Sequence, residues 1–272
     1  MKKLNLTDKR NPDYFYSEAI KTLRTNIQLS GQSIKTILVT SCFPNEGKSD
    51  VVLSLAQELG SIGKKVLLLD ADIRKTAYAG RLGVEEEVKG LSQLLSGQVG
   101  LQDIIYETNF PNMDIIFGGP AAPNPSGLLS ENIFKVFLKE VREYYNYILI
   151  DTPPIGTVID AAVIGRCCDG AIFLIQPGSV RYRDAQKAFA QLERDLISKR
   201  TKEALQARKA KGIKLGKPVG TIQGSIYDKD KEKIKELHSL GVTLTNISKK
   251  HLGYGTIKSL SEYVKNKLDK EK

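Results

Sequence analysis

The stretch Ser41-Cys42-Phe43-Pro44-Asn45-Glu46-Gly47-Lys48-Ser49 follows an apolar run and opens an amphipathic segment at about Ser49. A strand, a loop ending in Gly-Lys-Ser and a helix, in this order, form a P-loop. Its amides and the helix N-terminus hold phosphate oxygens. We expect Lys48 to neutralise the β- and γ-phosphates of ATP and Ser49 to ligate magnesium. Cys42 stands where the Walker pattern has glycine, so this loop alone is also compatible with a chance match. The residues expected to bind ATP are Pro44, Asn45, Glu46, Gly47, Lys48, Ser49 and Asp50.

Three carboxylates follow two other apolar runs of strand type. Asp70 and Asp72 close the run at 66–70, and Asp151 closes the run at 147–151. A single Asp at a strand end is often a helix N-cap, but three beside a P-loop indicate a hard-cation site and a proton acceptor. We therefore predict Ser49, Asp70 and Asp151 as magnesium ligands, and Lys48, Asp70 and Asp72 as catalytic residues.

The order of the elements predicts the fold class. Helical stretches alternate with five apolar runs, at 36–40, 66–70, 114–117, 147–151 and 171–176, and a further helix is expected over 128–144. This alternation indicates an α/β fold with a parallel P-loop sheet flanked by helices. Beyond it we expect a long helix over 184–211 and three short helices, at 228–240, 243–251 and 256–267. Glycines separate the short helices, as in a small all-α helix-turn-helix module.

The net charge of +10 is unevenly distributed along the chain. Residues 1–187 carry 21 Lys and Arg against 21 Asp and Glu, whereas residues 188–272 carry 20 against 10. A neutral body joined to a basic end suggests modules with different partners, although a basic run can also be a solvated helix face. We expect a P-loop domain over 1–187, a basic helix and arm over 188–220, and a helix-turn-helix module over 221–272.

The sequence contains no apolar run long enough to span a bilayer and no signal-peptide pattern at its start, which predicts a cytoplasmic protein. Cys42, Cys167 and Cys168 lack the spacing of a zinc site or a redox pair, so we expect buried thiols.

The motifs over 1–187 resemble the bacterial tyrosine kinases of capsule and exopolysaccharide synthesis, whose Walker A′ and Walker B motifs match Asp70–Lys75 and Asp151–Pro154. The resemblance continues through 17–27, 90–97 and 118–126. It implies ATP and Mg²⁺ as cofactors, a protein tyrosine as substrate and a membrane-anchored activator of the polysaccharide-chain-length type, which could recruit the kinase to the inner face of the membrane. It also implies a homo-oligomer assembled through Glu18, Lys21 and Arg24.

Three departures from this family suggest impaired activity. Lys21 replaces an arginine, which loses a bidentate guanidinium. Asp50 stands where the family usually has threonine and brings a negative charge near the α-phosphate. The last strand of the family domain and its tyrosine-rich tail are not found after Gln176 and the following helix.

The end of the chain, from about residue 188, resembles the long helix, arm and DNA-binding module of serine recombinases of the resolvase and invertase family. In that family the arm enters the minor groove and the last helix enters the major groove. The catalytic domain with its nucleophilic serine is not found, so we do not expect an active recombinase. The resemblance implies DNA contacts from Arg194, Lys199, Arg200, Arg208, Lys209, Lys214, Lys217, Thr256, Lys258 and Ser259.

Three functional hypotheses remain open from the sequence. The first is a protein-tyrosine kinase of impaired activity that is fused to a tail that binds duplex DNA. The second is a DNA-binding protein derived from a resolvase, with a vestigial or switch-like P-loop ATPase. The third is a non-functional gene fusion, because the junction near residues 184–189 falls within a single helix.

Overall fold

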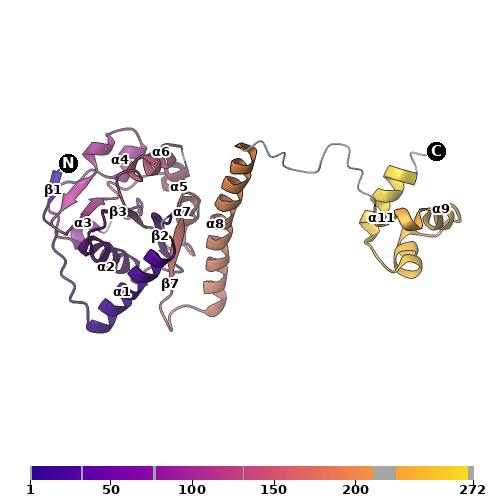
Figure 1. The fold of residues 1–272 in the computed structure, drawn as a ribbon, viewed down its shortest axis with the longest axis horizontal. Coiled ribbons are helices and arrows are strands. Elements are labelled where there is room, and N and C mark those ends of the chain that lie inside the picture. Colours follow the sequence, from indigo (N-terminus) through magenta and orange to yellow (C-terminus); the bar gives the residue numbers. More distant parts are fainter. Residues whose placement is uncertain (1, 32, 76–77, 131, 211–224, 269–272) are drawn as a thin grey trace. The chain divides into compact units, whose positions relative to one another are not determined.

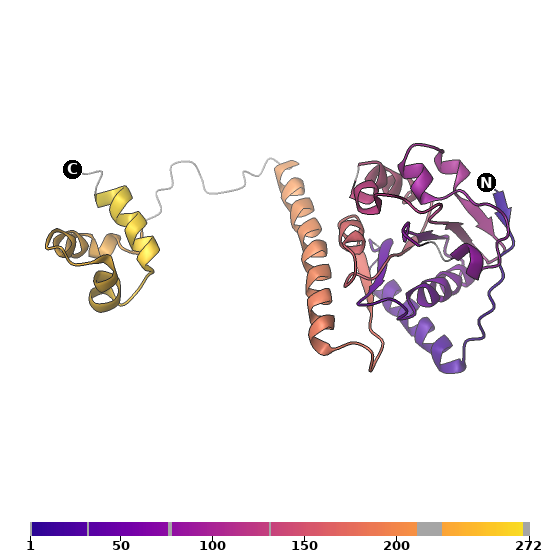
Figure 2. The same ribbon diagram turned by 180° about the vertical axis from the view of Figure 1, so that it is seen from behind.

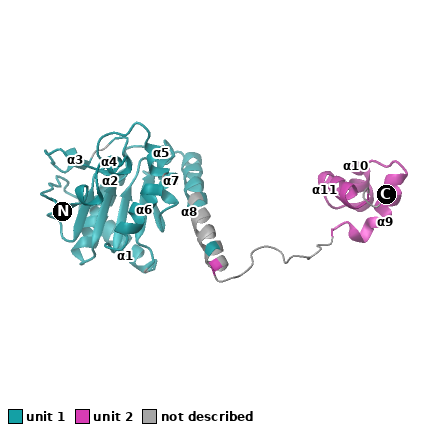
Figure 3. Cartoon of the chain, turned by 90° about the horizontal axis from the view of Figure 1, so that it is seen from above, with its two compact units in different colours: residues 1–207 teal, residues 208–272 magenta. Residues whose placement is uncertain are grey.

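The structure is a computed structural model that describes residues 2–31, 33–75, 78–130, 132–210 and 225–268. The contacts within the chain define two compact units, Met1–Ala207 and Arg208–Lys272 (Figure 3).

The first unit is built on a seven-stranded sheet in the order β1-β4-β5-β3-β6-β2-β7 (Figure 1). Most neighbouring strands are parallel, and β4 pairs antiparallel with β5. The strand that precedes the P-loop, β2, lies between β6 and β7, so two neighbouring strands also end beside the loop. The strands are β1 (Lys2–Leu4), β2 (Thr36–Ser41), β3 (Val66–Asp70), β4 (Tyr106–Thr108), β5 (Met113–Ile116), β6 (Tyr147–Asp151) and β7 (Gly170–Leu174).

Helices cover both faces of this sheet (Figures 1 and 2). Successive residues of a strand point to opposite faces. On β3, accordingly, Val66 and Leu68 belong to the core beneath α1 and α2, whereas Leu67 and Leu69 belong to the core beneath α4 to α8. The helices are α1 (Tyr14–Leu29), α2 (Lys48–Ser61), α3 (Tyr78–Arg81), α4 (Leu91–Leu95), η1 (Leu101–Asp103), α5 (Pro125–Ser130), α6 (Asn132–Val141), α7 (Asp160–Gly165) and α8 (Tyr182–Ala210).

The predicted α/β class and its five strands are confirmed, whereas the sequence reading missed β1 and β4. The helix expected over 128–144 corresponds to α6 and the end of α5, which lie on either side of residue 131, a residue outside the described ranges. Pro125 opens α5 earlier than the apolar periodicity indicates, since proline suits the first position of a helix.

The long helix α8 packs on the sheet through the first half of its length. Ala185, Ala188 and Leu192 are buried, and the Phe189 ring lies 6.1 Å from that of Phe173 on β7. The first half of this helix therefore packs on the core, although Phe189 is half exposed. Among the described residues no strand follows α8, and β7 pairs only with β2.

The second unit has a small core of its own. Tyr227, Ile234, Ile247 and Leu260 are almost fully buried and form one cluster with Tyr263, Val264 and Leu268. The three short helices predicted from the sequence are present, two of them extended by π-helical turns. The elements are η2 (Asp228–Asp230), α9 (Lys231–Ser239), α10 (Leu244–Asn246), η3 (Ile247–Leu252), α11 (Ile257–Tyr263) and η4 (Val264–Leu268).

Glycine is required at one tight connection of this unit. Gly255 has a φ of 80°, and a Cβ atom at this position would lie 2.0 Å from the Tyr227 hydroxyl oxygen. The positive φ and the close approach of Tyr227 thus explain why position 255 is a glycine. Within the described ranges, none of the helices is long and apolar enough to cross a membrane.

Candidate nucleotide and metal site

The loop from Cys42 to Gly47 joins the carboxyl end of β2 to the N-terminus of α2. Asn45 and Gly47 have φ angles of 65° and 83°, in the left-handed region that Asn tolerates and Gly adopts without cost. No side chain caps the first turn of α2, so its amides remain available to an anion. This is the geometry that a phosphate-binding loop requires.

Glu46 has a structural role within this loop. Its carboxylate accepts hydrogen bonds from the amides of Phe43, at 2.6 Å, and Gln176, at 3.0 Å. The side chain is buried and does not line the nucleotide cavity. The P-loop is therefore tied to the segment that follows β7, and the predicted contribution of Glu46 to ATP binding is limited to its backbone.

Asp70 and Asp151 end neighbouring strands and are paired in register on β3 and β6. Both side chains are buried, and among the described residues Oδ2 of Asp70 and Oδ1 of Asp151 have no hydrogen-bond partner. The Ser49 hydroxyl donates to Oδ2 of Asp151 at 2.5 Å. The three predicted metal ligands therefore meet at one point, with two carboxylate oxygens unsatisfied.

Burial of these carboxylates alters their titration. Burial and the charge of Asp151 raise the pKa of Asp70 well above its usual value. Burial likewise raises the pKa of Asp151 to about 6, although Ser49 and Lys48 oppose the shift. A bound divalent cation would favour the ionised form of both groups. Without a cation, burial therefore opposes the ionisation of these two neighbouring carboxyl groups.

Ser49, Asp70 and Asp151 suit a magnesium ion that takes its remaining ligands from the phosphates of a bound nucleotide. No group of three or more His, Cys, Asp and Glu side chains in the described part of the chain is placed to hold a metal. Mg²⁺ usually takes one or two carboxylates and completes its shell with water and substrate phosphates. Ser49, Asp70 and Asp151 beside the α2 N-terminus supply that kind of partial shell.

The site opens into a cavity of about 400 Å³. Asp72 lies on its wall, where its Oδ1 accepts from the amides of Arg74, at 3.3 Å, and Lys75, at 3.1 Å. Burial raises the pKa of Asp72. The predicted residues that line the cavity are Pro44, Asn45, Gly47, Lys48, Ser49, Asp50, Asp70, Asp72 and Asp151.

Tyr78 and Arg81 also line the cavity and were missed by the sequence reading. Tyr78 is buried, and its hydroxyl donates to the Ser49 carbonyl at 3.1 Å. Burial and the charges of Asp151 and Asp70 raise its pKa well above the usual value. Both residues belong to the short helix α3, whose four residues give too weak a periodic pattern to place them.

Asp50 is surrounded by arginines. Arg81 forms an ion pair with its carboxylate, and a guanidinium nitrogen of Arg10 lies 3.6 Å from the same oxygen. Arg10 also donates to the Asp50 carbonyl at 2.7 Å and pairs with Asp8. The negative charge that the sequence placed near the nucleotide is therefore partly compensated by cations from α3 and from the segment before α1.

The residues predicted for oligomer assembly interact within the chain. Lys21 pairs with Glu18 on the exposed surface of α1 at 2.8 Å. Arg24 reaches across to Glu58 of α2 at 3.0 Å. Of these two pairs, Arg24–Glu58 joins α1 to α2, whereas Lys21–Glu18 lies within α1. The role of the three residues between subunits stays a prediction.

The residues predicted to contact DNA lie in several settings. Arg194 is exposed on α8, where its Nε donates to the Ala190 carbonyl at 3.1 Å, and Lys258 is exposed on α11. Thr256 caps α11, and Ser259 bonds both to Thr256 and to the Tyr227 hydroxyl, at 2.8 Å, so both hydroxyls have structural roles. The side chains of Lys199, Arg200, Arg208 and Lys209, and the whole of Lys214 and Lys217, lie outside the described residues.

The fold and the site define a P-loop nucleotide-binding protein. A family model described as an AAA domain matches residues 35–205. The septum site-determining protein MinD of Pyrococcus horikoshii, solved with Mg-ADP, superposes with a TM-score of 0.52 at 27% identity and covers 59% of this chain and 65% of that one.

Closer similarity lies with kinases. The tyrosine-protein kinase CpsD of Streptococcus agalactiae is 40% identical over 185 residues, which is 68% of this chain and 78% of that protein. The kinase domain of the Escherichia coli tyrosine kinase ETK superposes with a TM-score of 0.63 at 29% identity, over 66% of this chain and 71% of that one. The chain belongs to the family of bacterial tyrosine-protein kinases, through its P-loop unit.

Proposed function

We propose that the first unit is an ATP-dependent protein-tyrosine kinase that acts in the regulation of capsule or exopolysaccharide synthesis. The observation that carries this proposal is the pair of unsatisfied, buried oxygens of Asp70 and Asp151 beside Ser49 and the α2 N-terminus. Similarity to CpsD-type kinases supports the choice of phosphoryl transfer over simple nucleotide binding.

Each residue has a role that its position suits. The α2 amides and Lys48 would bind the phosphates, and Ser49, Asp70 and Asp151 would hold magnesium. The ion, when bound, supplies positive charge to the phosphoryl group undergoing transfer. Asp72 faces the cavity with a raised pKa, which suits a group that accepts the proton of the attacking tyrosine hydroxyl.

The partners of this kinase follow from the same family. We propose a cytoplasmic enzyme that works with a membrane-anchored activator, phosphorylates protein tyrosines and assembles with copies of itself through α1. The side chains of Glu18 and Lys21 on α1 are each 46% exposed and so are accessible to a neighbouring subunit.

A phosphorylation assay tests the kinase role. The purified chain, incubated with ATP, Mg²⁺ and a tyrosine-containing peptide, should transfer phosphate to tyrosine. Asp72→Asn should slow transfer by about 10²-fold or more while ATP binding persists, because a general base typically contributes that factor. Tyrosine phosphorylation by Asp72→Asn at the parent rate would contradict the assigned role of Asp72.

A second function, binding of duplex DNA, is favoured by the second unit. Residues 225–268 carry nine Lys and Arg against five Asp and Glu, and they form a separate core with short helices. The basic segment 194–217 adds nine cations against two acids. This excess of positive charge suits a phosphate backbone.

Gel shifts of the full chain against salt test this function. Log affinity for duplex DNA should fall linearly with log salt, by roughly 0.9 for each phosphate contact. Lys214→Ala and Lys217→Ala should weaken binding to all sequences about equally, and Lys258→Ala should change the preference between sequences. Absence of binding at about 50 mM salt, a condition that favours phosphate contacts, would exclude this function.

A further inference from the structure

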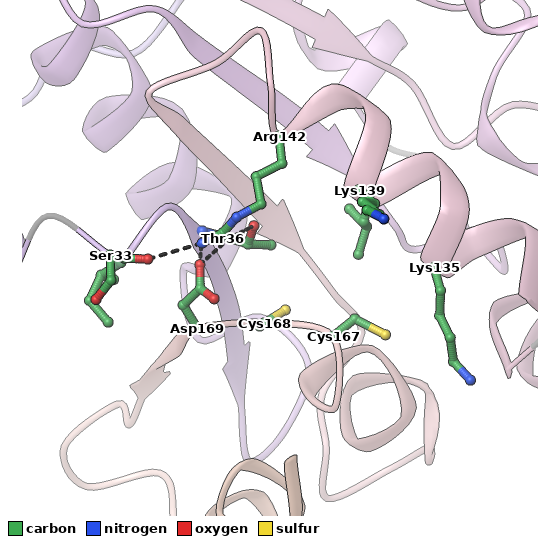
Figure 4. A pocket seen from close by; sticks show the side chains of 10 residues that line it. Ser33, Thr36, Lys135, Lys139, Arg142, Cys167, Cys168 and Asp169 are labelled. Atoms are coloured by element: carbon green, nitrogen blue, oxygen red, sulfur yellow. Dashed lines mark hydrogen bonds and ion pairs between the residues drawn. The ribbon is translucent and has the colours of Figure 1, made fainter. Parts of the chain in front are cut away.

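A second cavity, of about 680 Å³, opens at the opposite end of the sheet from the nucleotide site. It lies where β2 and β7 begin, whereas the P-loop follows the end of β2. Its walls are the segment before β2, one side of α6 and the turn between α7 and β7 (Figure 4). A volume in this range accommodates a small organic molecule.

One wall of this cavity is fixed by an ion pair. Arg142 pairs with Asp169 and donates to the Ser33 carbonyl, at 3.0 Å, and to the Thr36 hydroxyl, at 2.9 Å (Figure 4). Asp169 also accepts from the amides of Lys35 and Thr36. Burial raises the pKa of Asp169, but Arg142 and these amides together hold it below its usual value. The two charges cancel, so this wall is polar but carries no net charge.

Lys135 and Lys139 leave the cavity with an excess of positive charge. They lie one turn apart on α6, and both line the cavity. Among the described residues, neither ammonium group has an ion-pair partner. Like charges at this spacing destabilise a helix by roughly 0.2–0.5 kcal/mol. The helix dipole favours Lys139 in the last turn, but it does not favour Lys135 near the start of α6.

We propose that this cavity binds a small organic diphosphate. Lys135 and Lys139 would hold the phosphoryl oxygens as point charges, and Arg142 would border them. Ile34, Leu138 and the half-buried Cys167 would contact the organic part, since they supply the apolar lining. The proposal is independent of the kinase assignment, because none of these residues belongs to the nucleotide site.

Calorimetric titration with uridine diphosphate and with inorganic pyrophosphate tests the proposal. The full chain carrying Lys48→Ala is used, so that the P-loop does not contribute. Both probes should bind, and uridine diphosphate should bind more tightly because it also covers the apolar lining. Adding Lys135→Ala and Lys139→Ala should weaken both by at least about tenfold, since two charge-assisted contacts are lost.

Two controls make the result specific. Lys3→Ala with Lys89→Ala removes the same charge from exposed lysines that do not line the cavity, and it should leave affinity unchanged. Bound uridine diphosphate should also slow alkylation of Cys167. The proposal is overturned if neither probe saturates, if the two lysine pairs behave alike, if the organic group adds no affinity, or if Cys167 reacts at the same rate with and without the probe.

Discussion

Ser49 and Asp151 share a short hydrogen bond, while the second oxygen of Asp151 and one oxygen of Asp70 are buried and have no partner in the described part of the chain. An unsatisfied buried carboxylate oxygen is costly, and such groups are rare away from functional sites. The cost is explained if the site is built to gain a cation together with phosphate. The two strand ends contribute the charge, and the loop contributes the hydroxyl.

Asp50 gives a prediction at the same scale. Its carboxylate lines the nucleotide cavity and forms an ion pair with Arg81. Asp50→Thr should remove the repulsion between this carboxylate and the phosphates of ATP. It should also free the Arg81 guanidinium to interact with those phosphates. ATP should bind about threefold to tenfold more tightly, in line with ~1 kcal/mol for a partly exposed charge.

Calorimetry of ATP binding measures this effect. Asp50→Asn, which removes the charge with little change of shape, should behave like Asp50→Thr. Glu85→Gln, an exposed acid that does not line the cavity, should leave affinity unchanged. Equal or weaker ATP binding by Asp50→Thr would show that Asp50 does not oppose the nucleotide.

Among the elements, those with strong apolar runs could be predicted from sequence. The central strands β3 and β6 were placed at their observed bounds because all five residues of each run read as buried strand. The edge strand β1 and the strand β4 were missed because each has three residues and includes charged ones. Their pairing depends on tertiary partners, which a local pattern does not reveal.

The turn at Gly255, which joins η3 to α11, gives a prediction at the scale of the elements. Gly255→Ala places a Cβ in the left-handed region and 2.0 Å from the Tyr227 hydroxyl, so the second unit must rearrange. Gly241→Ala has a similar φ of 78° but open space around its Cβ, and should cost only backbone strain, about 1–2 kcal/mol. Gly255→Ala should therefore destabilise this unit more than Gly241→Ala.

Amide hydrogen exchange locates the effect. The amides of the buried residues Ile234 and Leu260 should exchange faster in Gly255→Ala than in Gly241→Ala, whereas those of β3 should not change. The same exchange rates in the two variants would mean that the Tyr227 contact does not restrict this turn.

At the scale of the whole molecule, both the charge along the sequence and the contacts within the chain distinguish an N-terminal part from a C-terminal part. The charge balance of the sequence changes near residue 187, whereas the contacts divide the chain after Ala207. The two boundaries differ because the first half of α8 packs on the sheet. Motif spacing predicted Lys48, Ser49, Asp70 and Asp151 at one site. It could not predict Tyr78, Arg81 or Arg10, whose positions depend on how α3 and the segment before α1 fold against α2.

The most direct test of the account is calorimetric titration of the full chain with ATP, with and without Mg²⁺. We predict saturable binding that Mg²⁺ strengthens, near-complete loss of binding in Lys48→Ala, and loss of the Mg²⁺ dependence in Asp151→Asn. ATP binding that is unaffected by Mg²⁺ and by both substitutions would contradict the assignment of this site.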